Sequence, residues 1–386
     1  MLYYRYRSGS ELSIKELIYD ELYFASQAEC NDPYEGKVFA VLNKDEELWN
    51  NLIRIALKFY SSNTVEYLIK RVVDYFVSKA PLYLNELITI SKSEFINLGK
   101  TQIERIVLSN MLEEIKQYAS LYMPAEQYFA SFSKRNDNYL MWSHYANNHS
   151  GFCLIFRALD GRIQQNPKWM RKSISYSTPK AFSKKMSFAI PESFEIKKVE
   201  YSTKPKCLDG FMGFPAGVSN DRYTPQEIDD FQKEYSDTYM KKHTVWDYEE
   251  EYRVVLSSGM PWLTGERMSV SSQQRLFHYN STQLVGIVLG NKMPYDKRQR
   301  IKEIIAEKVE RWYIPTTGHR IISDFVLFEE KLSETNREVK IEPVEIYSCS
   351  SVIDKSHKVF EKSYKNWQDG YAIKFEDTKA SRIQLK

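Results

Sequence analysis

The sequence is poor in the residues that mark secretion, membrane insertion and structural metal sites. Its 386 residues contain only four cysteines, and no two of them form a CxxC pair. This scatter argues against a zinc ribbon and against a disulfide framework. No apolar run approaches the roughly 18–20 residues that cross a bilayer, and the first residues lack the apolar segment of a signal peptide. We therefore expect a cytoplasmic protein with reduced thiols and no membrane contact.

Several common catalytic and nucleotide-binding motifs are also missing. The chain has no GxxxxGK[ST] loop, no GxGxxG that opens a helix and no GxSxG, which argues against a phosphate-binding loop and the usual serine hydrolase motif. There are only six histidines, and the spacing of His144, His149 and Cys153 matches no usual zinc pattern. We expect no metal. The net charge of +3 is too small to indicate nucleic-acid binding by itself.

Aromatic residues are abundant, at 14% with 28 tyrosines, and they are dense in residues 131–156. That stretch predicts a strand, a loop, a short helix, a tight turn and a second strand. Polar and aromatic residues at seams between short elements favour a site. His144 could serve there as a general acid or base, because the pKa of a histidine lies near neutrality. A structural, hydrogen-bonded histidine is the alternative.

The remaining pattern predicts an α+β protein with a mostly antiparallel, split sheet that is interrupted by helices. Hydrophobic periodicity predicts strands at 2–7, 21–26, from about 250 and at 284–290, and helices at 10–20, 224–243 and 295–309. Repeats at i, i+3, i+4 and i+7 predict three or four helices between 43 and 123. We divide the chain into a core of residues 1–42 and 124–315, a helical insertion of residues 43–123, and a C-terminal extension of residues 316–386 that packs on the core. The insertion is a candidate surface for a regulatory protein partner.

Three groups of residues in chain order could carry chemistry. They are Arg5 and Arg7 on the first strand, Ser131 and Ser133 on a middle strand, and Glu249 and Glu251, followed by Arg253, on a late strand. Residues i and i+2 of a strand face the same way, so each pair is expected to point together. Paired carboxylates beside arginine suit the stabilisation of a cationic sugar centre next to an anionic group. A solvated face with surface ion pairs is the alternative.

A fourth group, Asn31, Asp32 and Pro33 with Glu35, follows the second predicted strand. It could bind ribose hydroxyls or cap a turn, and the residue types suit either role.

The ordered motifs of the chain resemble the bacterial domain-of-unknown-function family 2971. The resemblance rests on YRYR, LYFAS followed by NDP, SFS, WSHYA with HSGF, and WDYEEEYR, at residues 4–7, 22–26, 31–33, 131–133, 142–146, 149–152 and 246–253. It extends to about residue 290 and leaves out the helical insertion and the residues beyond about 310. The family name implies no activity.

The order Arg, SxS, ExE is also similar to the pattern of ADP-ribosyltransferases. This resemblance implies a split sheet that grips NAD as a substrate, with no metal. Arg5 or Arg7 would then hold the phosphates or ribose, and Ser131 and Ser133 would brace the nicotinamide pocket. In the same comparison Glu251 would bind the ribose hydroxyl and stabilise the oxocarbenium ion, while Glu249 would orient the acceptor.

We therefore expect an ADP-ribosyltransferase-like enzyme that modifies a protein or a nucleic acid, as a bacterial toxin or antiphage-defence effector. The residues expected to line its site are Glu251, Glu249 and His144 as catalytic groups, and Arg5, Arg7, Ser131, Ser133, Tyr145, Asn31 and Asp32 as NAD-binding groups. One alternative is a metal-dependent nuclease or other hydrolase centred on His144, His149 and Asp32. Another is a non-enzymatic sensor or interaction module.

Overall fold

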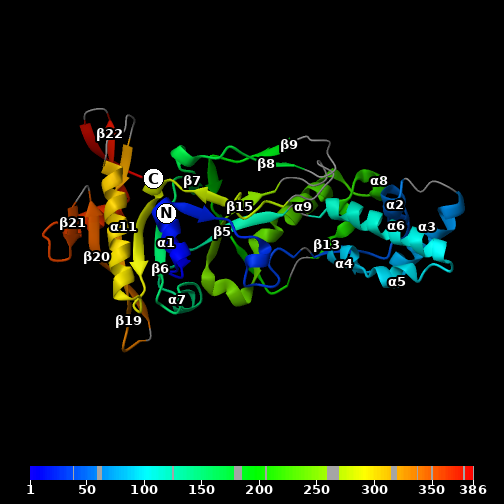
Figure 1. Ribbon diagram of the computed structural model, residues 1–386, viewed down its shortest axis with the longest axis horizontal. Helices are drawn as coiled ribbons and strands as arrows, with labels where there is room; N and C mark the ends of the chain where they lie inside the picture. Colours follow the sequence, from blue (N-terminus) through cyan, green and yellow to red (C-terminus); the bar gives the residue numbers. More distant parts are fainter. Residues whose placement is uncertain are drawn as a thin grey trace.

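A nine-stranded mixed sheet organises the computed structural model (Figure 1). The structure describes residues 1–37, 39–58, 63–123, 126–177, 185–204, 207–258, 269–313, 320–336, 338–348, 351–376 and 379–385. In spatial order the strands are β11 (Lys197–Lys198), β15 (Glu251–Ser257), β5 (Gln127–Ser133), β1 (Leu2–Arg7), β6 (Phe152–Arg157), β17 (Leu284–Leu289), β19 (Phe325–Leu332), β20 (Val339–Ser348) and β21 (Ser351–Asp354). The strand that opens the chain therefore lies near the middle of the sheet.

The predicted α+β class with a mostly antiparallel sheet holds at the level of a mixed sheet. Each described pairing in the main sheet is antiparallel, except that β17 and β19 run parallel. Parallel neighbours need a crossover, and helix α11 (Tyr295–Tyr313) supplies it. The likeness to the ADP-ribosyltransferase sheet stays a prediction.

Strand register places the predicted polar residues side by side. On β15 and β5, Arg253 is opposite Ser131 and Glu251 is opposite Ser133. On the other edge of β5, Ser133 is opposite Tyr4 of β1. Cross-strand neighbours have Cβ atoms about 5 Å apart, so three segments distant in the sequence present side chains to one small area of the sheet.

Residues 131–156 adopt the predicted order of elements. After β5, Asn138 caps helix α7 (Tyr139–Tyr145) by accepting hydrogen bonds from the backbone amides of Leu140 and Met141, and β6 follows. Between them, Gly151 lies so close to β1 that a Cβ atom would sit 2.1 Å from the carbonyl oxygen of Arg7. Only glycine fits there, and this close approach fixes α7 beside β1.

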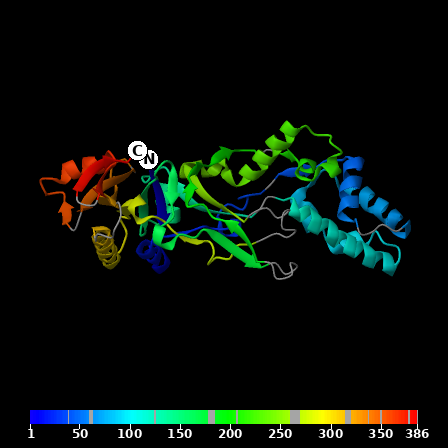
Figure 2. The same cartoon turned by 90° about the horizontal axis from the view of Figure 1, so that it is seen from above.

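The apolar residues form separate cores at the sheet and at the far helical end (Figure 2). The helical end contains α2 (Glu46–Ala56), α3 (Asn63–Lys79), α4 (Leu84–Thr89), α5 (Lys92–Ile96) and α6 (Gln102–Leu121). These helices also pack on Phe211, Phe214 and Phe231, from a segment that we assigned to the other unit. The predicted domain limits stay a prediction.

The C-terminal residues extend the main sheet through β19, β20 and β21. A smaller sheet of β18 (Arg320–Ser323), β22 (Tyr371–Glu376) and β23 (Lys379–Gln384) lies next to helix α12 (Phe360–Gln368). The indole of Trp367 in α12 is buried and donates a hydrogen bond of 2.8 Å to the carbonyl of Val285. This contact fastens the C-terminal segment to the core.

The shorter elements surround the sheet. They are helices α1 (Glu11–Tyr19), α8 (Ala216–Ser219) and α9 (Pro225–Ser236), and strands β2 (Glu21–Tyr23), β3 (Ala40–Leu42), β4 (Leu82–Tyr83), β7 (Arg162–Gln164), β8 (Ser173–Ser177), β9 (Lys185–Ala189), β10 (Ser193–Glu195), β12 (Glu200–Ser202), β13 (Leu208–Asp209), β14 (Lys241–His243) and β16 (Leu276–His278). None of the described helices is long and apolar enough to span a bilayer.

The helix predicted over residues 224–243 is wrong in its second half. Helix α9 ends at Ser236, and Lys241–His243 form β14, which pairs in parallel with β12. A proline at the first position and a capping box at Thr224 mark where α9 starts. The pairing with β12 determines its end, because a strand partner distant in the sequence outweighs the local helical pattern.

Candidate active site

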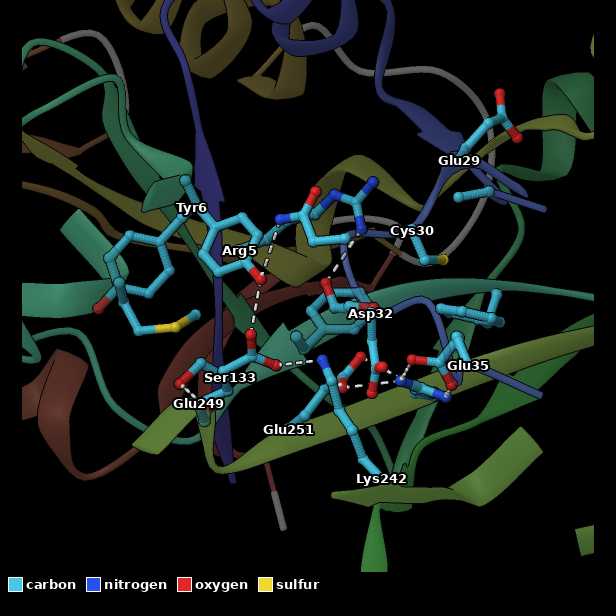
Figure 3. Close-up of a pocket in the computed structure, with 18 of the residues that line it drawn as sticks. Arg5, Tyr6, Glu29, Cys30, Asp32, Glu35, Ser133, Lys242, Glu249 and Glu251 are labelled. Atoms are coloured by element: carbon cyan, nitrogen blue, oxygen red, sulfur yellow. Dashed lines mark hydrogen bonds and ion pairs between the residues drawn. The ribbon is translucent and has the colours of Figure 1, made fainter. Parts of the chain in front are cut away.

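A cavity of about 270 Å³ lies over β1, β5 and β15, and Figure 3 shows the side chains that enter it. The wall opposite these strands is the loop between β2 and β3. Most of the residues that we predicted for the site line this cavity: Arg5, Arg7, Asn31, Asp32, Ser131, Ser133, Tyr145, Glu249 and Glu251. Glu35, Lys242 and Arg253 line it as well. The structure therefore brings together groups that are up to about 250 positions apart in the chain.

A fully buried arginine anchors the floor of the cavity. The Arg253 guanidinium donates to Glu251 at 2.8 and 2.9 Å and to Glu35 at 2.6 and 2.8 Å. Both carboxylates are therefore held in bidentate pairs, the strongest geometry for a carboxylate with arginine. The predicted alignment of Arg253 with Glu251 on one strand face is present, but the predicted alternative of a solvated face is wrong because the pairs are buried.

Lys242 joins this cluster to the second acid. Its ammonium group lies 2.6 Å from Glu249 and 3.2 Å from Glu251. On its far side Glu249 accepts a hydrogen bond of 2.6 Å from the hydroxyl of Tyr145, which itself accepts one of 3.4 Å from Asn31. A continuous series of polar contacts thus crosses the cavity, visible as the dashed lines in Figure 3.

The two acids titrate in opposite directions. Burial raises the pKa of Glu249, and the opposing pull of Lys242 is too weak to reverse this. Burial also acts to raise the pKa of Glu251, but the charge and hydrogen bonds of Arg253, with help from Lys242 and Ser131, lower it to about 2. Pairs of carboxylates whose environments push their pKa values apart are typical of acid–base sites. Here Glu249 is the acid suited to proton transfer, and Glu251 is a fixed anion.

The two acids meet for a different reason from the one we predicted. Glu249 ends a 3₁₀ helix, Thr244–Glu249, and β15 begins only at Glu251. Between them Glu250 has a left-handed backbone with φ of 41°. The alternation of a strand therefore cannot align Glu249 with Glu251, and that prediction is wrong. Their shared contact with Lys242 holds them together.

Arg5 and Arg7 are on the same strand, but their surroundings differ. Arg7 pairs with the carboxylate of Glu16. Arg5 is buried and donates only to two carbonyls, those of Ser131 at 3.0 Å and Tyr23 at 3.4 Å, so no carboxylate of a described residue neutralises it. Burial lowers the pKa of Arg5 to about 10, which still leaves it charged at neutral pH. A buried cation without a counter-ion beside a cavity is suited to an anionic ligand.

The two serines hold the acids in place. The Ser133 hydroxyl donates to the backbone carbonyl of Glu249 at 2.7 Å and accepts from the amide of Arg135 at 3.1 Å. The Ser131 side chain hydrogen-bonds the Glu251 carboxylate. Their predicted contact with nicotinamide stays a prediction, and their present partners are the protein's own acids.

His144 lies away from the cavity, exposed beside Tyr145 and Tyr248 in a shallow hollow that Asn31 also borders. His149 points elsewhere. It is buried, with Nδ1 2.5 Å from Glu330 on β19 and Nε2 3.3 Å from the Ser143 hydroxyl. The two histidines therefore do not converge, which removes the geometric basis of a hydrolase centred on both. No cluster of three or more potential metal ligands occurs among the residues that the structure describes.

Asp32 occupies a turn, as one of our two readings predicted. Its carboxylate accepts a hydrogen bond of 2.9 Å from the amide of Tyr34. The same residue also lines the main cavity and the two cavities beside it. Capping the turn and bordering the cavity are therefore compatible roles.

Sequence reasoning missed Lys242, the residue that links the two acids. The pair Lys241-Lys242 looks like the basic end of a helix, and we assigned it so. Three residues of β14 instead direct Lys242 inward. A lysine a few positions before a WxYExE motif was the available signal, but a single sequence does not reveal that it is buried.

Comparison with known proteins supports the family resemblance. A family model described as "Protein of unknown function (DUF2971)" matches residues 141–254. The resemblance that we predicted is confirmed, and the match extends from α7 to β15. Neither the curated proteins nor the solved structures gave a match.

Proposed function

We propose that the main cavity binds NAD, cleaves the bond between nicotinamide and ribose, and transfers the ADP-ribosyl group to a macromolecule. The observation that carries this proposal is that a buried cation without a counter-ion, Arg5, and an acid of raised pKa, Glu249, line the same cavity. The first suits a phosphate of the substrate, and the second suits the reacting sugar.

The dimensions agree with such a ligand in part. A volume of about 270 Å³ is near the lower end of the roughly 300–1,000 Å³ typical of ligand sites. It suits the nicotinamide and ribose half of NAD, with Arg5 facing the adjoining phosphates. Tyr23 and Phe132 near Arg5 supply flat apolar surface for the ring.

The acids take roles that differ from those implied by the resemblance. When the bond from ribose C1′ to the nicotinamide nitrogen breaks, the electron pair leaves with nicotinamide and positive charge develops on the sugar. The Glu249 carboxylate would stabilise this charge electrostatically, the type of effect that dominates many enzymes. The acceptor then forms the new bond to C1′ and gives its proton to Glu249. Glu251 stays ionised and holds Lys242 and Arg253 in position.

The experiment uses NAD labelled on its adenosine half, incubated with the purified protein and cell extract. We expect label in protein or nucleic acid, together with release of nicotinamide. Glu249→Gln removes the negative charge with little change in shape, and Glu250→Gln is the matched control because Glu250 lies outside the cavity lining. Equal labelling by wild type and Glu249→Gln, or no labelling by wild type, contradicts the proposal.

A further inference from the structure

A second cavity lies beside the first and shares two residues with it. It encloses about 530 Å³ and lies between β12, β14 and the turn around Tyr34. Asp32 and Lys242 line both cavities. The Lys242 side chain runs from its strand to the two acids (Figure 3), so the second cavity opens next to the reacting groups of the first.

The lining of the second cavity is rich in cations. Lys37, Lys204, Lys241 and Lys242 contribute to it, against three carboxylates. Lys241 and Lys242 are paired with acids. Lys37 and Lys204 are exposed, and no carboxylate of a described residue forms an ion pair with either. These two ammonium groups are available to an anionic ligand at the mouth of the cavity.

Aromatic rings complete the lining. Tyr34 is 62% exposed, with the ammonium of Lys37 4.7 Å from its ring centre. Phe39 and Tyr201 form the deeper apolar wall. The hydroxyl of Tyr201 accepts a hydrogen bond of 2.8 Å from the backbone amide of Glu251, which fixes this ring against the floor of the first cavity. Flat rings alternating with unpaired lysines are the surface that single-stranded nucleic acids use.

We propose that the second cavity holds the acceptor, and that the acceptor is a single-stranded nucleic acid. A base would stack on Tyr34 or Tyr201 while Lys37 and Lys204 contact the flanking phosphates. A duplex would keep its base faces covered and could not use these rings. An acidic peptide would satisfy the lysines but leave the exposed aromatic surface without a matching flat group.

This inference rests on the proposed function for its chemical step and defines its acceptor. A nitrogen or oxygen of the bound nucleotide forms a bond to ribose C1′ as nicotinamide departs with the electron pair of the broken bond. The proton of the acceptor passes to Glu249. The shared Lys242 lies between the two sites, next to both acids.

The test is binding of a fluorescent 12-nucleotide single strand, as DNA and as RNA, followed by anisotropy at several salt concentrations. The double variant Lys37→Glu/Lys204→Glu is expected to weaken binding at least about tenfold and to lower the salt slope by about two, one for each lost phosphate contact. Lys168→Glu/Lys358→Glu changes the same charge at exposed positions outside the cavity and is expected to bind like wild type.

The outcomes separate this inference from the proposed function. Release of nicotinamide from NAD without any acceptor reports on the first cavity alone. If nicotinamide is released and only protein becomes labelled, with no binding of the oligonucleotide, the nucleic-acid acceptor is refuted and the proposed function stands. Equal binding by both double variants also refutes it. Selective loss of binding without any nicotinamide release supports the nucleic-acid site and removes the proposed reaction.

Discussion

In residues 43–123 the ion pairs lie near the surface, whereas around the main cavity they lie in the interior. Arg54 and Glu66 in the helical segment keep side-chain exposures of 46% and 55%, against 1% for both Arg253 and Glu35. Among the described residues of 43–123, no charged side chain is buried. One chain thus contains an apolar core and a core with charged groups inside it.

The difference shows which region is shaped for stability alone. Replacing a buried ion pair by apolar groups is often neutral or stabilising, because removing charge from water costs several kcal/mol per ion. The helical segment follows that economy. The sheet core instead keeps Arg5, Lys242 and Arg253 with three acids around one cavity. Strongly perturbed charges in a cavity favour a functional site.

The largest effect should come from removing the central cation. Arg253→Ala leaves Glu35 and Glu251 buried without a partner, and we expect the free energy of unfolding to fall by about 3–5 kcal/mol. Arg54→Ala in the helical segment should cost at most about 1 kcal/mol. Urea unfolding of both variants measures this. Similar losses would remove the contrast between the two regions.

A second prediction uses pH to separate the two acids. The folded-state pKa of Glu251 is depressed to about 2 from 4.5, so its contribution is complete above pH 4.5 and is lost as pH falls toward 2. At 1.36 kcal/mol per pKa unit this amounts to about 3 kcal/mol. The raised pKa of Glu249 acts in the opposite direction, because its protonation on acidification favours the folded state.

The variant Glu249→Gln should therefore lose more stability than wild type between pH 7 and pH 3. Chemical unfolding of both proteins across this range provides the measurement. A smaller loss in the variant would mean that Glu249 is not the acid with the raised pKa.

The smallest of these effects concerns Arg5. Arg5→Met should weaken binding of ADP-ribose about ten- to a hundredfold, the value of a hydrogen bond to a charged group, about 1.5–3 kcal/mol. Stability without ligand should change little, since Arg5 has no carboxylate partner to lose. Titration calorimetry compares it with Arg135→Met, which removes an exposed cation outside the cavity. Equal affinities for the two variants would contradict an anion site at Arg5.

Sequence patterns predicted the elements whose signals are local. The strand at 2–7, the helix that starts at 295 and the strand at 284–289 follow from side-chain periodicity and agree with the structure. The resemblance also led us to the arginines, serines and acids that line one cavity. What could not be predicted depends on distant contacts. Lys242 reaches the site because β14 pairs with β12, and the division of roles between Glu249 and Glu251 depends on Arg253 and burial.

The central claim is that Arg5 binds and Glu249 reacts within one cavity. The most direct test is the rate of nicotinamide release from NAD, measured over a range of NAD concentrations for wild type and both variants. We predict that Glu249→Gln lowers kcat about 10²–10³-fold with little change in KM, and that Arg5→Met mainly raises KM. Unchanged kcat in Glu249→Gln, with the fold intact, would contradict the account.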